Sequence, residues 1–69
     1  MVNGRRIREL REAAGLTMVE LAEKVYVSQT EISRVEMEVR SPSVALLKRI
    51  ADYFDVPVDD LLKESAAIT

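Results

Sequence analysis

The sequence predicts an all-α protein, and three observations support this class. Apolar residues recur at helical spacing along the chain, and no run of alternating β-branched residues is long enough for a strand. Residues that commonly begin helices precede these apolar segments. The composition, 48% apolar and 4% aromatic among 69 residues, indicates one small domain with an aliphatic core. We assign this domain to residues 1–64 and a short C-terminal tail to residues 65–69.

The first helix is expected at about residues 4–14. Asn3 can cap its start, because an asparagine side chain accepts hydrogen bonds from the free amides of a first turn. Gly15 supplies the left-handed residue that ends it. Three residues at helical spacing form its inward face: Ile7, Leu10 and Ala14.

The second and third helices are expected to meet through a very tight turn. Thr17 and Glu20 form a capping box, in which the hydroxyl and the carboxylate each accept a hydrogen bond from the other residue's amide. This box begins the second helix. Ser28 and Glu31 form a similar box, which begins a third helix at about residues 28–37. Two residues of the third helix are expected to face the core: Ile32 and Val35.

The fourth helix, at about residues 43–54, is expected to be the hub of the core. Ser43 can cap it after a break at Pro42, because the residue before a proline resists helical angles. Its apolar series is the strongest in the chain and has five members: Val44, Leu47, Ile50, Ala51 and Phe54. A fifth and last helix is expected after Pro57, with two aspartates in the first turn, where the helix dipole favours negative charge.

The composition also excludes several classes of function. The chain has no cysteine and no histidine, which removes disulfides, thiol nucleophiles, the usual zinc ligands and the commonest general base. We therefore expect no enzyme, no cofactor, no metal site and no small-molecule substrate. No segment is long and apolar enough for a membrane span or a signal peptide, so we expect a cytoplasmic protein without a membrane partner.

The net charge of −2 conceals an uneven distribution along the chain. Residues 1–49 carry nine Lys or Arg and seven Asp or Glu, whereas residues 50–69 carry one and five. A local field matters more than the overall charge when a ligand touches one face of a protein. The first part of the chain is therefore compatible with a polyanionic partner.

Nearly the whole chain, about residues 5–63, carries a known pattern. The segment LTMVELAEKVYVSQTEISRVE is preceded by IRELREAAG and followed by RSPSVALLKRIADYFDVPVDDLL. This pattern resembles the Cro/cI-type helix-turn-helix proteins of bacteria and phages, the lambda-repressor-like or XRE family. The resemblance implies a compact five-helix domain with a helix-turn-helix at the second and third helices. It also implies a repressor-like regulator of transcription that binds double-stranded DNA, and an ion pair between Arg11 and Glu36 that joins the first and third helices.

One face of the third helix is predicted to contact DNA bases in the major groove. On a helical wheel of about 100° per residue, four polar side chains fall opposite the two inward residues. They are Gln29, Thr30, Ser33 and Arg34. A glutamine can pair with adenine and an arginine with guanine through two hydrogen bonds each, and a threonine methyl group can contact thymine.

Contacts with phosphates are expected from residues around this face. Thr17 begins the second helix, Ser28 begins the third, and Arg40 follows the third. We also expect a homodimer on a roughly palindromic operator, because one short helix supplies few specific contacts and paired half-sites multiply the discrimination. The dimer interface is predicted at three residues near the C-terminus: Val58, Leu61 and Leu62. The two leucines are also expected to complete the core, with one of them facing the second subunit.

Four residues, at three places in the chain, depart from the pattern of the family. Where the family commonly has a glutamine, a turn glycine and an Asn-Gly pair, this chain has Met18, Tyr26 and Met37-Glu38. A left-handed turn at Tyr26 costs about 1 kcal/mol, unless the turn differs locally. An apolar rim beside the recognition face has four members: Met18, Val19, Met37 and Val39. The alternative function is therefore a helix-turn-helix fold that binds a protein partner through this rim, as an antitoxin or the partner of a regulator.

Overall fold

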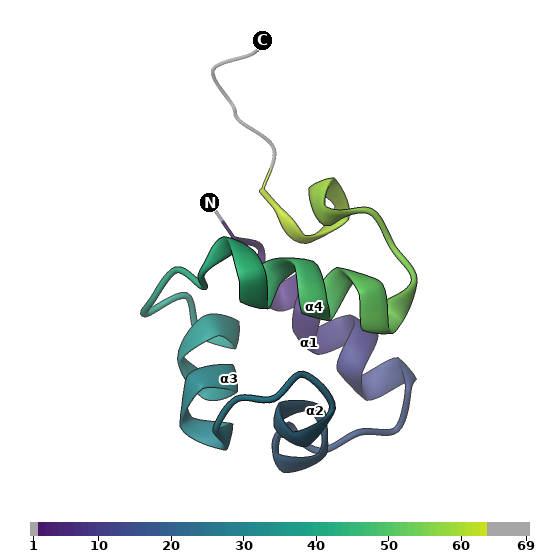
Figure 1. The fold of residues 1–69 in the computed structure, drawn as a ribbon, viewed down its shortest axis with the longest axis vertical. Helices are drawn as coiled ribbons and strands as arrows, with labels where there is room; N and C mark the ends of the chain where they lie inside the picture. Colours follow the sequence, from purple (N-terminus) through teal and green to yellow (C-terminus); the bar gives the residue numbers. More distant parts are fainter. Residues whose placement is uncertain (1, 64–69) are drawn as a thin grey trace, which may run out of the picture.

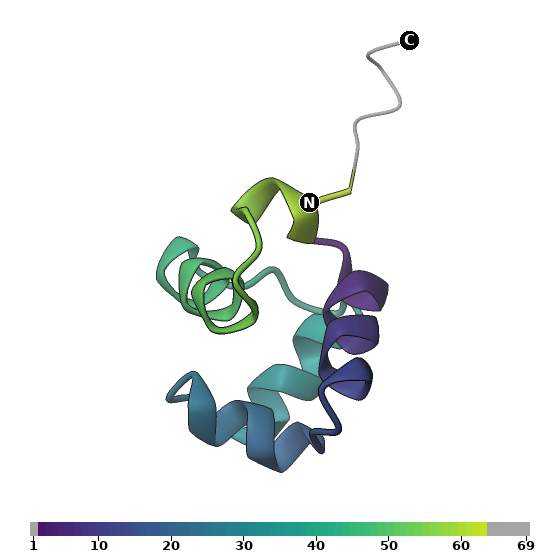
Figure 2. The same cartoon turned by 90° about the vertical axis from the view of Figure 1, so that its right-hand side faces the viewer.

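The computed structural model describes residues 2–63, which form four α-helices and one short 3₁₀ helix. The elements are α1 (Gly4–Ala13), α2 (Met18–Lys24), α3 (Gln29–Glu36), α4 (Val44–Phe54) and η1 (Val58–Leu61). In Figure 1, α4 crosses in front of α1, and α2 and α3 lie together below them. Figure 2 shows α1 and α4 on opposite sides of the molecule, with α2 at the end farthest from the termini. The predicted all-α class is confirmed.

Side-chain caps begin all four α-helices at the predicted positions: Asn3, Thr17, Ser28 and Ser43. The Thr17 box is complete, because its hydroxyl accepts from the Glu20 amide at 3.1 Å and the Glu20 carboxylate accepts from the Thr17 amide at 2.8 Å. At the start of α3, the Ser28 hydroxyl accepts from the Glu31 amide at 3.2 Å. Within the described residues the reciprocal half of this second box does not form, so the second box is a simple serine cap.

The core is aliphatic and receives residues from every helix. Ile7 of α1, Leu21 of α2, Ile32 of α3 and Ile50 of α4 are fully buried, and smaller apolar residues fill the space between them. Val35 is also fully buried, so the predicted inward face of α3 is correct. Burial of a side chain of this size stabilises the fold by about 1.5–3 kcal/mol. None of the helices within residues 2–63 has the length and apolar content needed to cross a lipid bilayer.

Two residues assigned to inward faces are exposed instead. Val44, in the predicted apolar series of α4, is 83% exposed because it occupies the first turn of the helix, where the apolar stripe runs past the end of the core. Leu46 is buried in its place. Ala14 is exposed because α1 ends one residue earlier, at Ala13, and Arg11 takes the inward position one turn before.

The predicted fifth helix is a four-residue 3₁₀ turn, η1, rather than an α-helix. It ends at Leu61 because Leu62 is extended and forms an antiparallel bridge with Val2. The Asn3 amide adds a hydrogen bond of 2.7 Å to the Leu61 carbonyl oxygen. The two ends of the domain are therefore joined. The predicted tail at 65–69 lies outside the described residues.

The turn between α2 and α3 is left-handed although it contains no glycine. Tyr26 has a φ of 64°, as the family pattern predicts for this position. Its side chain is 81% exposed, whereas the preceding Val25 is buried and the following Val27 packs against the core. The backbone strain at Tyr26, about 1 kcal/mol, is therefore sustained by the apolar residues on either side of it.

Candidate nucleic-acid interface

The predicted base-contact face lies on the solvent side of α3. Gln29, Thr30 and Arg34 are exposed, and Ser33 is half-buried. They lie opposite the buried residues of α3, since the helix has 3.6 residues per turn and presents two distinct sides. The structure thus brings the four predicted residues to one surface. Short polar side chains near the helix N-terminus allow the backbone to approach a groove closely.

The two methionines that replace family amides flank this face. Met18, the first residue of α2, is half-buried against the core, and its Sδ accepts a hydrogen bond from Gln29 Nε2 at 3.8 Å. Met37, which ends α3, is 68% exposed, and its Sδ accepts from Ser33 Oγ at 3.8 Å. Val19 and Val39 are exposed, as expected for members of the apolar rim. The methionine sulfurs, however, are in contact with polar side chains of the predicted base-contact face.

The residues predicted to contact phosphate lie around the same face. The hydroxyls of Thr17 and Ser28 each accept a hydrogen bond from a backbone amide of their own helix. A hydroxyl group that accepts in this way keeps its own hydrogen, which it can donate to a phosphate oxygen. Arg40 is exposed in the segment that joins α3 to α4.

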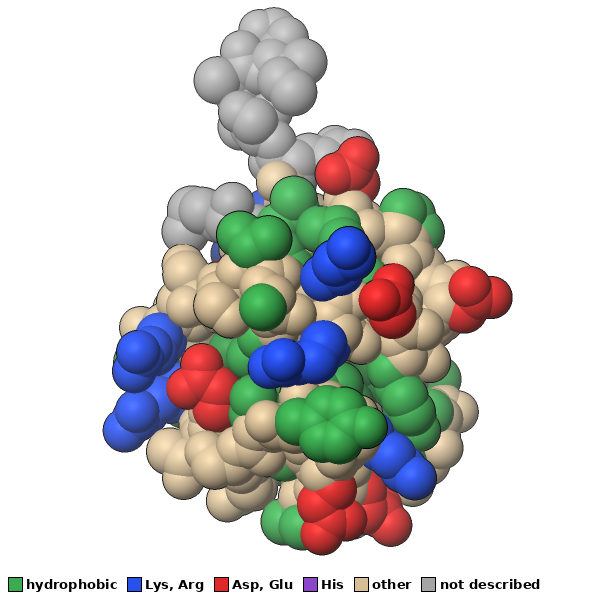
Figure 3. All heavy atoms as spheres, in the orientation of Figure 1, with side chains coloured by type: hydrophobic (Ala, Val, Ile, Leu, Met, Phe, Trp, Pro, Cys, Tyr) green, Lys and Arg blue, Asp and Glu red, His purple; other side chains and the backbone are tan. Residues whose placement is uncertain are grey.

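The cations of this molecule fall into two groups. All four arginines of α1 form ion pairs. Among residues 2–63, five cations have no carboxylate within 4.0 Å: Lys24, Arg34, Arg40, Lys48 and Arg49. Figure 3 shows Lys and Arg side chains over α4 and beside α3, whereas acidic side chains gather over α2 and toward the C-terminal end of α4. The uncompensated positive charge therefore begins at the end of α2 and extends to α4.

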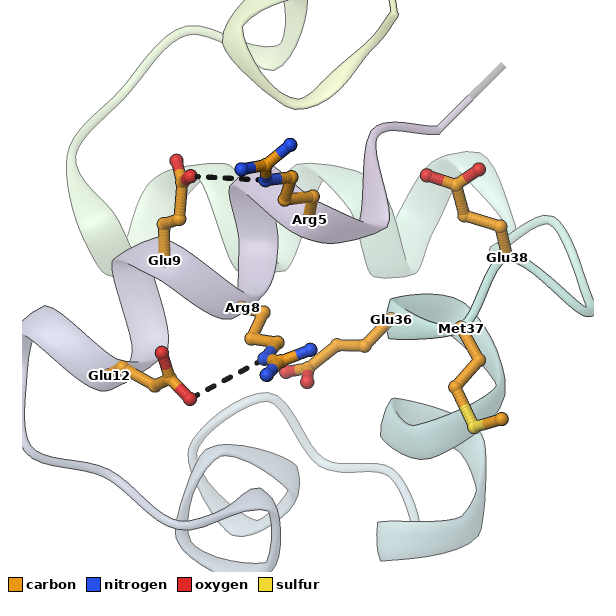
Figure 4. Close-up of a pocket in the computed structure, with 7 residues that line it drawn as sticks. All are labelled: Arg5, Arg8, Glu9, Glu12, Glu36, Met37 and Glu38. Carbon is orange, nitrogen blue, oxygen red and sulfur yellow. Dashed lines mark hydrogen bonds and ion pairs between the residues drawn. The ribbon is translucent and has the colours of Figure 1, made fainter.

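A hollow between α1 and the end of α3 contains much of the compensated charge. Seven residues line it: Arg5, Arg8, Glu9, Glu12, Glu36, Met37 and Glu38. Figure 4 shows two ion pairs along α1, between Arg5 and Glu9 at 3.7 Å and between Arg8 and Glu12 at 3.4 Å. Because carboxylates of the same helix neutralise these arginines, the outer face of α1 has little attraction for phosphate.

A buried ion pair joins α1 to α3. Arg11 donates from Nε to Glu36 Oε2 at 2.7 Å and from Nη2 to Glu36 Oε1 at 3.1 Å, and the side chains of Arg11 and Glu36 are 10% and 2% exposed. Nη1 donates to the Leu16 carbonyl oxygen at 2.9 Å. The hydrogen bond with Glu36 raises the pKa of Arg11 above its ordinary value. The predicted pair of Arg11 and Glu36 is confirmed, and it fixes α3 against α1.

A second contact between α1 and α3 was not predicted. Glu38 has a φ of 60°, and its Oε2 accepts from the Gly4 amide at 2.9 Å while its Oε1 accepts from Lys63 Nζ. The hydrogen bond from Lys63, followed by that from Gly4, lowers the pKa of Glu38 below its ordinary 4.5. A Cβ atom at Gly4 would clash with the Glu36 carbonyl oxygen. The only sequence signal was a glycine at the first position of the predicted helix, since glycine allows a close approach of two backbones.

The predicted dimer residues occupy different environments. Leu61 is fully buried in the core of the single chain, so its assignment to an interface is wrong. The reason is that η1 turns this side chain inward to cover α1 and α4. Val58 and Leu62 are half-buried and remain partly accessible.

A family model described as "Helix-turn-helix" matches residues 7–61. The chain belongs to the helix-turn-helix family. The HTH-type transcriptional activator BcrR of Enterococcus faecalis is 39% identical over 64 residues, which cover 93% of this chain and 31% of BcrR. The HTH-type transcriptional regulator SinR of Bacillus subtilis is 36% identical over 62 residues, covering 88% and 56%. This helix-turn-helix chain spans between 18% and 56% of the length of the curated relatives it matches. These relatives are regulators or repressors by name, which agrees with the expectation of a protein that is not an enzyme.

Solved structures agree with the family. The P22 c2 repressor in complex with a synthetic operator superimposes with a TM-score of 0.85 at 28% identity, covering 94% of this chain and 98% of the repressor. SinR in complex with DNA gives a TM-score of 0.78 at 35% identity, covering 86% of this chain and 98% of the SinR chain. The predicted lambda-repressor-like fold is therefore confirmed, apart from the form of the last helix.

Proposed function

We propose that this helix-turn-helix domain binds double-stranded DNA in a sequence-specific way and regulates transcription, with α3 in the major groove. The observation that carries this proposal is the contrast between the two sides of α3. One side is fixed to α1 by the buried pair of Arg11 and Glu36, and the other presents exposed polar side chains. Rigid support of this kind suits a helix that must place hydrogen-bonding groups against base edges.

The four residues on the outer side of α3 have distinct roles in this proposal. Gln29 pairs with adenine, Arg34 with guanine, Thr30 contacts the thymine methyl group, and Ser33 hydrogen-bonds a base edge. Such pairings are possible because, within residues 2–63, Arg34 has no carboxylate partner and the amide oxygen of Gln29 accepts no hydrogen bond. Each two-hydrogen-bond pairing contributes about 1–3 kcal/mol of discrimination between bases.

Phosphate contacts from Thr17, Ser28 and Arg40 fix the position of the domain on the duplex. They carry no sequence information, because every nucleotide has the same phosphate. The relatives support the assignment of the ligand, since the matched P22 c2 repressor and SinR structures are complexes with an operator and with DNA.

The domain acts as a homodimer in this proposal, with one α3 in each of two successive major grooves about 34 Å apart. The half-buried Val58 and Leu62 contribute to the contact between the two copies. Sedimentation velocity with and without a palindromic duplex tests this part. Two protein chains bound per duplex are expected, and a single chain bound to a duplex that contains two half-sites would contradict the dimer.

Selection of bound fragments from a random duplex pool tests the function as a whole. The wild-type chain is expected to enrich one motif. The Arg34→Ala variant is expected to lose preference at one base pair and about 1–3 kcal/mol of binding free energy. Arg8→Ala is the matched control, because Arg8 is also an exposed arginine but pairs with Glu12 on the outer face of α1. Equal losses in both variants, or no enriched motif, would contradict the proposal.

A protein-binding role for the apolar rim is the second candidate function. Met37 and Val39 are both exposed at the end of α3, and one matched structure is a complex of SinR with the SinI protein. Met37→Ser and Val39→Ser would then abolish a stable complex with a protein partner. Under this alternative, the random duplex pool yields no enriched motif.

A further inference from the structure

The contacts of Met18 and Met37 with the predicted base-contact face have a chemical consequence. The two sulfurs accept hydrogen bonds from two of the four side chains on that face, Gln29 and Ser33. One sulfur comes from the start of α2 and the other from the end of α3. The two contacts are therefore independent of each other and lie at opposite ends of the face.

A thioether sulfur accepts hydrogen bonds weakly and cannot donate one. A polar side chain beside it must therefore turn a hydrogen toward it, because an oxygen lone pair facing the sulfur gains nothing. For Gln29 this places Nε2, not Oε1, on the side of Met18. For Ser33 it directs the hydroxyl hydrogen toward Met37. A glutamine or asparagine at these methionine positions would impose no such direction, because an amide both donates and accepts.

We propose that Met18 and Met37 are specificity-determining positioning residues, which fix how Gln29 and Ser33 present donors and acceptors to the bases. This inference rests on the proposed function, since it assigns a detail of how the same face reads DNA. Neither methionine touches a base in this arrangement. Each acts through the neighbouring side chain that it orients.

The expected preference at the position of Ser33 follows from the direction of its hydroxyl. With its hydrogen committed to Met37, Ser33 Oγ offers only lone pairs to the groove. Adenine and cytosine each present an amino donor in the major groove, whereas guanine and thymine present only acceptors and, for thymine, a methyl group. The Ser33 position therefore favours a strand that carries adenine or cytosine. Ser33 lies four residues before Met37, so both are on the same side of the helix.

The expected preference at the position of Gln29 follows in the same way. With one Nε2 hydrogen directed to Met18, the amide keeps Oε1 and a second Nε2 hydrogen for the groove. Adenine offers the matching pair, an amino donor and the N7 acceptor. Met18 is half-buried against the core, so its sulfur is a fixed reference point for the amide. The orientation of Gln29 is thereby set before DNA arrives.

The test compares the base preferences of the wild-type and variant chains in a random duplex pool. Ser33→Ala and Gln29→Ala first identify the base pairs that these two residues read. Met37→Leu is then expected to reduce the preference for adenine or cytosine at the Ser33 position by about two- to fivefold. Met18→Leu is expected to reduce the adenine preference at the Gln29 position to a similar extent. All other positions of the motif remain unchanged in both variants.

Two controls separate polarity from shape. Val39→Leu alters another exposed apolar side chain of the rim, whereas Gln29 and Ser33 hydrogen-bond to Met18 and Met37, so this variant is expected to leave the motif unchanged. Replacement of all methionines by norleucine keeps the unbranched shape but removes the sulfur acceptor, so it is expected to relax the same two positions. Thermal unfolding of each variant shows whether the fold is intact.

Three outcomes would overturn the inference. The first is an unchanged motif in both leucine variants, and the second is a uniform loss of affinity at every position, which indicates a structural role. The third is relaxation by leucine but not by norleucine, which assigns the effect to shape. In all three the wild-type chain still enriches a motif, so the proposed function stands. A wild-type chain that enriches no motif overturns both proposals.

Discussion

The two sides of α3 differ in how completely their polar groups are satisfied. On the inner side, Glu36 and Glu38 are bound by Arg11, Gly4 and Lys63, and the backbones of α1 and α3 are in close contact. On the outer side, polar side chains face solvent, and their contacts within the described residues are weak ones to sulfur. The comparison teaches that one short helix can be rigidly held and still keep most of its hydrogen-bonding capacity for a ligand.

The largest effect is expected when the inner side loses its ion pair. Arg11→Ala leaves Glu36 as a buried charge without a cation, which costs about 3–5 kcal/mol of unfolding free energy. Arg8→Ala removes an exposed pair and costs at most about 1 kcal/mol. Urea denaturation of both variants measures the difference. Similar losses for the two arginines would remove the distinction between the buried and the exposed pairs of α1.

A second change on the inner side concerns the close approach at Gly4. Gly4→Ala is expected to reduce the unfolding free energy by about 1–3 kcal/mol, because the added methyl group pushes α1 away from the Glu36 carbonyl oxygen. Gly15→Ala is the matched control, since open space surrounds Gly15 and only its φ of 74° opposes a side chain. Its cost is about 1 kcal/mol. Urea denaturation measures the unfolding free energy of both variants. If Gly4→Ala loses no more than Gly15→Ala, then α1 and α3 move apart easily at this contact.

On the outer side, Arg40 is expected to affect binding and not stability. Arg40→Ala weakens binding to all duplex sequences alike and reduces the slope of log K against log salt by about 1. Its unfolding free energy stays within about 0.5 kcal/mol of the wild type, as for other exposed residues. Fluorescence anisotropy titrations at several salt concentrations give the slope. A change confined to one base pair would instead make Arg40 a reader of sequence.

The smallest effect is expected from the titration of Glu38 on the inner side. The pKa of Glu38 in the folded protein lies below the ordinary 4.5. The ionised carboxylate therefore stabilises the fold at pH values above 4.5, and this stabilisation is lost as the pH falls through the folded-state pKa. The wild type is therefore expected to lose stability faster than Glu38→Gln between about pH 5 and pH 3. Thermal unfolding across this range provides the measurement. Parallel curves for the two proteins would mean that Lys63 and Gly4 do not favour the ionised form.

Local signals predicted the parts of the fold that depend on neighbouring residues. The caps at Asn3, Thr17, Ser28 and Ser43 were correct because a side chain three residues from an amide decides where a helix begins. The inward side of α3 was also correct, because periodicity alone defines it. The pair of Arg11 and Glu36 came from the family resemblance, since no local pattern joins residues so far apart.

Burial was predicted wrongly for residues near the ends of helices, because it depends on how far the core extends in three dimensions. Val44 is on the apolar side of its wheel, yet the core stops before it. Leu61 and Leu62 were both expected to complete the core, with one of them also facing a second subunit, and the sequence could not decide which; η1 turns Leu61 fully inward. The two hydrogen bonds that Glu38 accepts from Gly4 and Lys63 could not be predicted either, because they join three segments that are distant in sequence.

The bridge between Val2 and Leu62 places both ends of the described chain at one pole of the molecule, while α2 occupies the other (Figures 1 and 2). A fluorescent label or an affinity tag joined to the domain next to Val2 or Leu62 would consequently leave it on the side remote from α2. Tethering the domain to a surface through such a tag should leave the start of α3 open to approaching nucleic acid. The same arrangement makes the domain suitable for fusion to other proteins.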